Sequence, residues 1–259
     1  MPIDPLQLTL IALGGFAGGM LNALAGGGTF LSFPALLAAG VSPVSANATN
    51  AVALWPASIS SAWALRRELR PLPWRNYLRP LLLAAALGGL LGGLLLLLTT
   101  DQAFYRLIPW LLLLATLLFT LSRPLANWLQ HHRQPHSAPR LGVAGWCGQT
   151  LVSVYGGFFG AGMGILMIAS LAISGRTRLV EISAIKSLLS SVIYSVAAIT
   201  FMLAGAVHWP ALLVMLAGTL PGGWAGGRLA RRLPDAWLRV LVIAVGWSLT
   251  LYYFADVYL

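Results

Sequence analysis

Charged side chains are scarce in this sequence. Asp, Glu, Lys and Arg make up only 8% of the 259 residues, whereas 58% of the residues are hydrophobic. Water-soluble domains carry about 25% charged residues, so the composition excludes a soluble domain. It predicts instead an all-α polytopic membrane protein whose helices cross the lipid bilayer.

Cysteine and lysine are nearly absent. The single cysteine, Cys147, excludes an intrachain disulfide bond. The first 25 residues contain no Lys or Arg, so they lack the positive region of a cleavable signal peptide and we expect them in the mature protein.

The formal net charge is +10, but fifteen of the sixteen basic residues are Arg at the ends of apolar segments. This pattern is typical of membrane topology signals and does not indicate nucleic-acid binding.

Motifs for catalysis and cofactor binding are missing. The sequence contains no HExxH, GxSxG or Cys/His cluster. GAGMG, residues 160–164, is not a dinucleotide fingerprint, because no strand precedes it and a hydrophobic segment surrounds it. His131, His132 and His136 fit a solvated loop better than a metal site. We therefore predict that the protein is not an enzyme and needs no cofactor or metal.

Six apolar segments have the length of about 20 residues that a membrane crossing requires. They are residues 45–65, 80–98, 107–122, 180–204, 209–227 and 237–255. Two further segments, 6–39 and 141–174, are about 34 residues long and carry glycine clusters at their centres. Each could be one long broken helix or two shorter helices.

The two halves of the chain repeat one another. LAGGGTFLSFPALLAAG at 24–40 parallels FGAGMGILMIASLAISG at 159–175, and GGLLGG at 88–93 parallels GGWAGG at 222–227. A repeat at constant spacing indicates an internal duplication. We expect a first membrane repeat at 1–128, a polar cytoplasmic linker at 129–140 and a second membrane repeat at 141–259.

Arginine is unevenly distributed between equivalent connections of the two halves. RRELRPLPWRNYLR, residues 66–79, contains five Arg, while its partner GAVHWP, residues 205–210, contains none. Arg-rich loops stay on the cytoplasmic side of a membrane, and the other equivalent connections also differ in their Arg content. We therefore expect inverted repeats, with both termini periplasmic or otherwise extracytoplasmic.

Inversion requires an odd number of crossings in each half. Each 34-residue segment should then enter and leave on one side as a re-entrant hairpin, followed by three transmembrane helices. The alternative treats each segment as one broken crossing helix, which gives eight helices in parallel repeats. That arrangement places the Arg-rich loop at 228–239 outside the cytoplasm.

The glycine breaks are candidate anion sites. The second limb of each hairpin begins near the membrane midplane, where its unpaired N–H groups and the positive end of its dipole attract an anion. Glycine also permits close approach of the backbone to a ligand. The candidate residues are Gly26, Gly27, Gly28, Thr29, Gly160, Gly162, Met163 and Gly164. Packing between helices is the alternative, and we favour it for the glycines of 88–93 and 222–227.

Polar residues accompany both breaks. Lys186, the only lysine, lies inside a predicted crossing helix, where an ionised group is costly and usually faces a cavity or a partner. Snorkelling to the interface and pairing with Glu181 are alternatives, although the i, i+5 spacing aligns that pair poorly. Further candidate hydrogen-bonding residues, each of which could instead bridge helices, are Asn22, Asn47, Thr49, Asn50, Ser183 and Ser187.

The segments AGGGTFLSFPALLAAGVSPVSANATN, GGFFGAGMG and SAIKS resemble the TauE/SafE sulfite exporter family, and the likeness covers nearly the whole chain. The resemblance implies a bacterial inner-membrane permease that moves small sulfur-containing anions, such as sulfite, thiosulfate or organosulfonates. Relatives often carry an acid where this chain has Asn22, a departure that counts against proton coupling through that position.

We accordingly predict a secondary transporter that exports such an anion by alternating access. Backbone N–H groups at the two breaks would hold the anion, while Asn50 and Lys186 would close the site from opposite sides. An anion channel through the same cavity, or a non-transporting scaffold subunit, is the alternative. The sequence leaves open the anion, the direction, the coupling ion and the oligomeric state, a homo-oligomer included.

Overall fold

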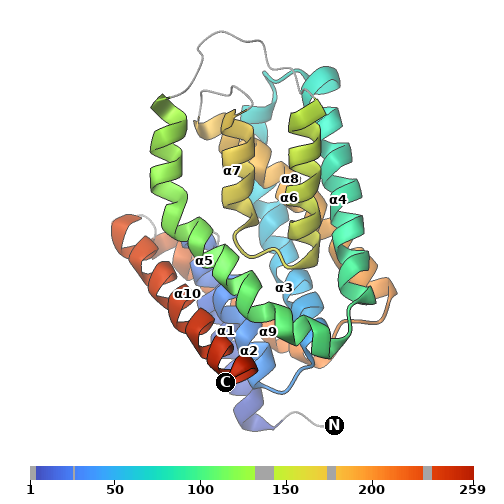
Figure 1. Ribbon diagram of the computed structural model, residues 1–259, viewed down its shortest axis with the longest axis vertical. Helices are drawn as coiled ribbons and strands as arrows, with labels where there is room; N and C mark the ends of the chain where they lie inside the picture. The colour runs from blue at the N-terminus through green and yellow to red at the C-terminus, as the bar shows by residue number, and fades with distance from the viewer. Residues whose placement is uncertain (1–3, 26, 132–142, 174–178, 230–234) are drawn as a thin grey trace.

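The computed structural model of the protein describes residues 4–25, 27–131, 143–173, 179–229 and 235–259 (Figure 1). All regular secondary structure in these residues is helical, as the composition predicts. The α-helices are α1 (Pro5–Ala25), α2 (Thr29–Ala38), α3 (Pro43–Ala64), α4 (Arg79–Leu98), α5 (Asp101–His131), α6 (Val143–Phe158), α7 (Met163–Ile173), α8 (Leu179–Leu203), α9 (Trp209–Leu229) and α10 (Asp235–Tyr258). Two short helical turns, Arg66–Leu69 and Trp74–Leu78, precede α4.

Each of the 34-residue segments forms two helices. The first forms α1 and α2, and the second forms α6 and α7. Gly160 and Gly162, between α6 and α7, have φ angles of 81° and 75°. A residue with a side chain rarely adopts this left-handed conformation, so a right-handed helix ends there. The sequence left one broken helix or two shorter helices open, and the structure has two.

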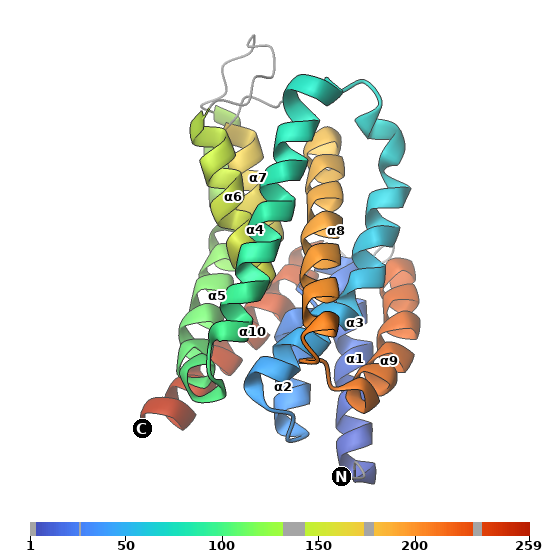
Figure 2. The ribbon, with the colours of Figure 1, turned by 90° about the vertical axis from the view of Figure 1, so that its right-hand side faces the viewer.

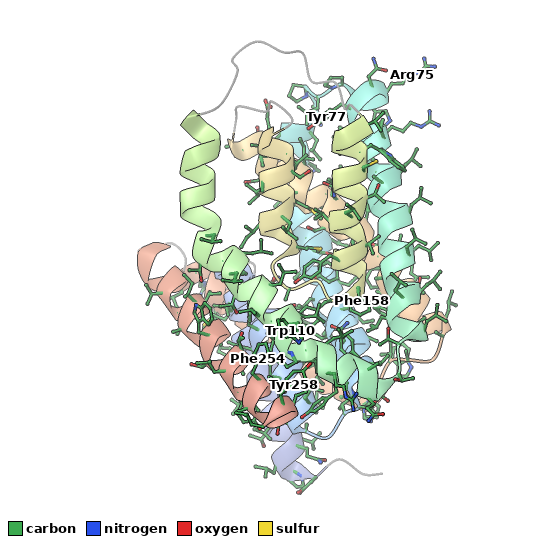
Figure 3. The ribbon with its side chains drawn as sticks, viewed as in Figure 1. Arg75, Tyr77, Trp110, Phe158, Phe254 and Tyr258 are labelled. Carbon is green, nitrogen blue, oxygen red and sulfur yellow. The ribbon has the colours of Figure 1, made fainter. Side chains whose placement is uncertain are left out.

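The two helix pairs occupy opposite ends of the molecule. In both ribbon views α1 and α2 lie in the half of the molecule that contains the two chain termini. α6 and α7 lie in the other half (Figures 1 and 2). The turn between α6 and α7 is near mid-height in Figure 1. Arg75 marks the end opposite Tyr258, which is the last residue of α10 (Figure 3).

Helices of the first half pack mainly against helices of the second half. α1 lies along α9, α4 along α6, α3 against α8, and α5 against α10. The glycines of residues 88–93 and 222–227 let two of these helix pairs approach closely. A Cβ atom added at Gly88 would lie 2.7 Å from the Thr150 carbonyl oxygen, and one at Gly226 would lie 2.5 Å from that of Met20. The packing interpretation is thus confirmed for these two glycines.

Four helical stretches in the described part of the chain are long and apolar enough to span a membrane. They are Trp74–Leu98, Asp101–Leu121, Val180–Leu203 and Val240–Tyr258. They match four of the six predicted crossings. The other two predicted crossings, 45–65 and 209–227, form α3 and α9 but are not among the four. Polar residues in α3 and glycine and proline in α9 make these two helices less apolar.

The predicted linker at 129–140 is described only at its start. Residues 129–131 belong to the end of α5, and the rest of the linker lies outside the described residues. The same is true of Gly26, one of the predicted site residues.

Phenylalanines fill the space between α2, α5 and the end of α6. Phe30 packs edge-on against Phe119 with ring centroids 5.5 Å apart. Phe33 packs against Phe159 at 5.6 Å, and Phe104 against Phe158 at 5.6 Å. We call these six residues the aromatic cluster. Edge-to-face contacts of this kind stabilise a packed apolar core.

Candidate functional site

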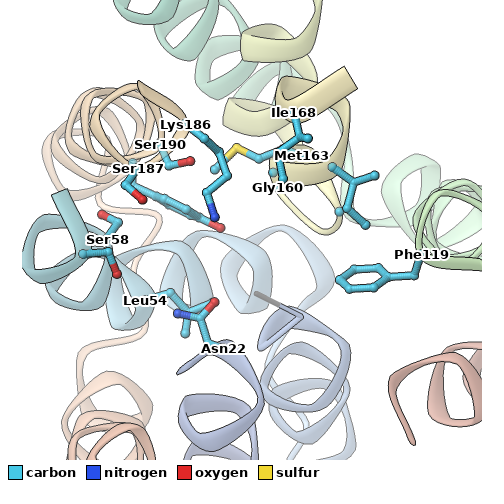
Figure 4. A pocket seen from close by; sticks show the side chains of 15 residues that line it. Asn22, Leu54, Ser58, Phe119, Gly160, Met163, Ile168, Lys186, Ser187 and Ser190 are labelled. Carbon is cyan, nitrogen blue, oxygen red and sulfur yellow. The ribbon is translucent and has the colours of Figure 1, made fainter. Parts of the chain in front are cut away.

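A cavity of about 140 Å³ lies where α7 begins, between α1, α3 and α8. The Lys186 side chain points into it from α8, and Asn22 of α1 lies across from Lys186 (Figure 4). The remaining polar side chains that line the cavity are hydroxyls, from Ser58, Ser61, Ser187, Ser190 and Tyr194. The cavity therefore combines one cation with neutral hydrogen-bonding groups.

Gly164, at the start of α7, lies beside the stem of the Lys186 side chain. A Cβ atom added at Gly164 would lie 3.5 Å from Cδ of Lys186, so the glycine packs directly against the stem of the lysine. Glu181, the partner considered from the sequence, is not among the residues that line the cavity. An ionised amine within a membrane helix is costly unless it faces a polar cavity or a counter-ion.

Seven of the fifteen predicted site residues line the cavity. They are Asn22, Gly160, Gly162, Met163, Gly164, Lys186 and Ser187. Four of the seven come from the break between α6 and α7. The positive end of the α7 dipole therefore lies beside the Lys186 ammonium.

Not every predicted backbone donor at this break is open to a ligand. The N–H of Met163 donates to the Gly160 carbonyl oxygen at 3.3 Å, and the N–H of Ile165 donates to that of Gly162 at 3.0 Å. The helix start contributes mainly its dipole and the space that its glycines leave.

The break between α1 and α2 is built differently. Gly27 and Gly28 are buried and do not line the cavity. A Cβ atom at Gly28 would lie 2.6 Å from the Gly18 carbonyl oxygen, so this glycine lets α2 approach α1. The two breaks are therefore not equivalent, and the one in the second half faces the cavity.

Asn50 lies in a buried network next to the cavity. Its amide Nδ2 donates to Oγ1 of Thr29 over a long 3.5 Å, and its Oδ1 accepts from the Ser32 hydroxyl at 2.5 Å. The Ser32 hydroxyl also contacts the Gly28 carbonyl oxygen at 2.9 Å. Asn50 is 2% exposed and does not line the cavity. The structure therefore places it where it holds the start of α2, and not opposite Lys186.

Three other predicted residues also lie away from the cavity. The Asn47 amide donates to the Phe158 carbonyl oxygen at 2.7 Å, and Thr49 Oγ1 accepts from the N–H of His208 at 2.9 Å. Ser183 is half-buried one turn before Lys186. Asn47 and Thr49 thus join α3 to other parts of the fold, which is the helix-bridging role that the sequence left open.

Tyr194 is a cavity residue that sequence reasoning missed. It lines the cavity, and its hydroxyl lies near Thr29. It thereby connects the cavity to the network around Asn50. Residues 186, 190 and 194 recur at intervals of four, which places them on one face of a helix. That spacing from Lys186 was the signal that could have identified both Ser190 and Tyr194.

A second cavity, of about 640 Å³, adjoins the first. The two share Asn22, Leu54, Ser61 and Lys186, and the second runs along α3 and α9 as far as Trp224. Leu54 is 3% exposed and Trp224 is 62% exposed, so the larger cavity deepens toward Lys186. It opens toward the carboxyl ends of α3 and α9.

An Arg–Trp pair stands at each of these helix ends. The Arg66 guanidinium lies 4.1 Å from the centre of the Trp63 ring, and that of Arg228 lies 3.7 Å from the centre of the Trp224 ring. Such contacts hold a guanidinium against an aromatic face.

The aromatic cluster bounds the small cavity on another side. Phe119 lines that cavity and packs against Phe30. The cavity is thus open along α3 and α9 and closed where α2, α5 and the end of α6 meet.

Comparison with known proteins gives consistent matches over nearly the whole chain. The family model described as "Sulfite exporter TauE/SafE" matches residues 11–253. "Probable membrane transporter protein YfcA" of Escherichia coli K12 is 29% identical over 244 residues, which cover 94% of this chain and 88% of the relative. A "Probable membrane transporter protein" of Haemophilus influenzae is 26% identical over 243 residues, covering 94% and 92%. One of Xylella fastidiosa is 30% identical over 246 residues, covering 90% and 88%. No solved structure matches the chain significantly.

Proposed function

Because this chain belongs to the TauE/SafE sulfite exporter family of multi-pass membrane transporters, we propose that it is a secondary transporter for a small sulfur-containing anion. Sulfite, thiosulfate and organosulfonates are the candidate substrates. The family is one of transporters and not of enzymes. The observation that carries the proposal is the Lys186 ammonium in a cavity lined otherwise by neutral groups.

The lysine and the hydroxyls supply what an oxyanion requires. Lys186 neutralises charge, and Ser187, Ser190 and Tyr194 on the same helix donate hydrogen bonds to oxygen atoms. The Asn22 amide reaches the anion from the opposite wall. A bound anion also offsets the cost of holding an ammonium within the membrane.

We propose further that the halves are inverted repeats that rock against one another. Two observations support this: the α1–α2 and α6–α7 pairs occupy opposite ends, and each half packs against the other through equivalent helices (Figure 1). The Arg-rich end that carries Arg75 is then cytoplasmic, and both termini are extracytoplasmic.

The cavity favours a carrier over a channel. It opens toward the carboxyl ends of α3 and α9 and is closed by the aromatic cluster. Alternating access would require the cluster to separate while the open side closes. An inside-negative potential favours exit of an anion by about 2.3 kcal/mol per charge per 100 mV, so export needs no coupling ion.

Flux of labelled sulfite into proteoliposomes tests this function. We expect saturable flux, exchange of labelled for unlabelled substrate, and loss of flux in Lys186→Ala. Ser183→Ala, one turn away on α8 and outside the cavity, is the matched control and should retain flux. Flux unchanged in Lys186→Ala would refute the role of Lys186. Flux that does not saturate would indicate a channel, and folded protein without flux would indicate a scaffold.

A further inference from the structure

Resting on the transporter function proposed above, we infer that the site selects singly charged anions over doubly charged ones. The inference ranks the candidate substrates: it favours hydrogensulfite and simple monosulfonates, which carry one negative charge, over thiosulfate, which carries two.

The charge inventory of the two cavities is the starting point. Among the described residues that line either cavity, Lys186 is the one side chain with a formal charge, and Asp, Glu and Arg are absent. The other polar groups are hydroxyls and one amide. A singly charged anion therefore cancels the formal charge of the side chains that line the site.

Lys186 has no internal counter-ion in the described part of the chain. No hydrogen bond or ion pair joins its ammonium to another described residue, and no carboxylate lines the cavity. Two arginines at the open side, Arg66 and Arg228, lie over the rings of Trp63 and Trp224. The substrate itself is thus the counter-ion of Lys186.

A second negative charge would have no full partner in this site. Hydroxyls and an amide stabilise an oxygen by hydrogen bonds but do not neutralise it, and a helix start supplies only about half an elementary charge. During alternating access the loaded site must close to water on both sides. A closed site with an unpaired charge is strongly disfavoured in a medium of low dielectric constant.

Methanesulfonate and sulfate form a matched pair of probes. Both place oxygens tetrahedrally around sulfur, and they differ in that a methyl group replaces one charged oxygen. We expect methanesulfonate to raise the melting temperature of the purified protein at concentrations at least about tenfold lower than sulfate, at equal ionic strength. Equal or tighter binding of sulfate would overturn the inference.

The same measurement separates the two proposals. Tighter binding of sulfate, together with saturable flux that depends on Lys186, leaves the transporter function standing and refutes the charge selection. Absence of binding and of flux for every anion refutes the transporter function, and the inference falls with it.

A second lysine in the cavity provides a direct charge test. Asn22 lines both cavities and lies across from Lys186 (Figure 4). Asn22→Lys should shift the preference at least about tenfold toward sulfate, because the site then carries two positive charges. Asn22→Gln keeps the neutral amide and should leave the preference unchanged.

Ser61→Lys provides the same charge test if Asn22→Lys does not fold. Ser61 lines both cavities and is exposed on α3, so a longer side chain fits there. It should produce the same shift, with Ser61→Gln as its control. A folded lysine variant that keeps the original preference contradicts the inference.

Discussion

The Lys186 ammonium and the Asn22 amide face one another across the cavity, one from each half of the chain (Figure 4). α8 carries the lysine and α1 carries the asparagine. Both residues also line the larger cavity that opens along α3 and α9. Any substrate that reaches Lys186 from this side therefore passes Asn22, which makes the pair the natural target for mutagenesis.

Asn22→Asp should weaken anion binding while the protein remains folded. The new carboxylate would lie across the cavity from Lys186 and pair with it, so the lysine would no longer be available to a substrate. We expect the concentration of sulfite that stabilises the protein to rise at least about tenfold. Thermal melting against sulfite checks this, with Asn22→Gln as the neutral control. Binding as tight as in the unaltered protein would show that Asn22 does not face the ligand.

Tyr194→Phe should reduce the transport flux strongly and lower the melting temperature only slightly. The change removes a hydroxyl that lines the cavity near Thr29, and loss of one such polar interaction lowers the free energy of unfolding by about 1 kcal/mol. Flux in proteoliposomes and the melting temperature measure the two effects. Tyr252→Phe is the control, because Tyr252 is exposed and lies outside both cavities. Equal flux in the two variants would remove Tyr194 from the site.

Gly160→Ala and Gly205→Ala separate backbone strain from a role in the site. Both glycines have positive φ angles, 81° and 67°, so alanine should destabilise the fold by about 1–2 kcal/mol at either position. A Cβ atom at Gly160 would also lie 3.0 Å from the Tyr194 hydroxyl, whereas one at Gly205 meets nothing within 4 Å. We expect both variants to have a lower melting temperature, and only Gly160→Ala to bind the substrate more weakly. Matching affinities would show that the α6–α7 turn contributes to the fold alone.

Cysteine labelling tests the inverted arrangement. Cys147 is exposed and must first be replaced by serine. Cysteines introduced at Gln102, in the first turn of α5, and at Arg228, near the end of α9, should then react from opposite sides of the membrane in intact cells. A membrane-impermeant reagent should reach position 102 from outside, and position 228 only after permeabilisation. Labelling of both positions from one side would defeat the inverted repeats.

The sequence predicts those features of the fold that depend on neighbouring residues along the chain. Apolar length predicts the four spans, and the family resemblance read from the motifs is confirmed by the match over residues 11–253. The glycine clusters also predict where the long segments break, because Gly160 and Gly162 adopt a conformation that other residues avoid. The sequence did not decide between one broken helix and two, since both satisfy the same pattern.

The composition of the cavity depended on how the helices pack. Asn50 and Lys186 occupy matching positions of the two repeats, yet Asn50 is buried against Thr29 and Ser32 while Lys186 lies in the cavity. Tyr194 lies in the site because it is on the same face of α8 as Lys186 and Ser190. The sequence by itself determined the helices, their breaks and the single lysine, because these depend on local conformation and composition. Only the tertiary structure decided which polar groups surround that lysine, because side-chain partners come from helices distant in the chain.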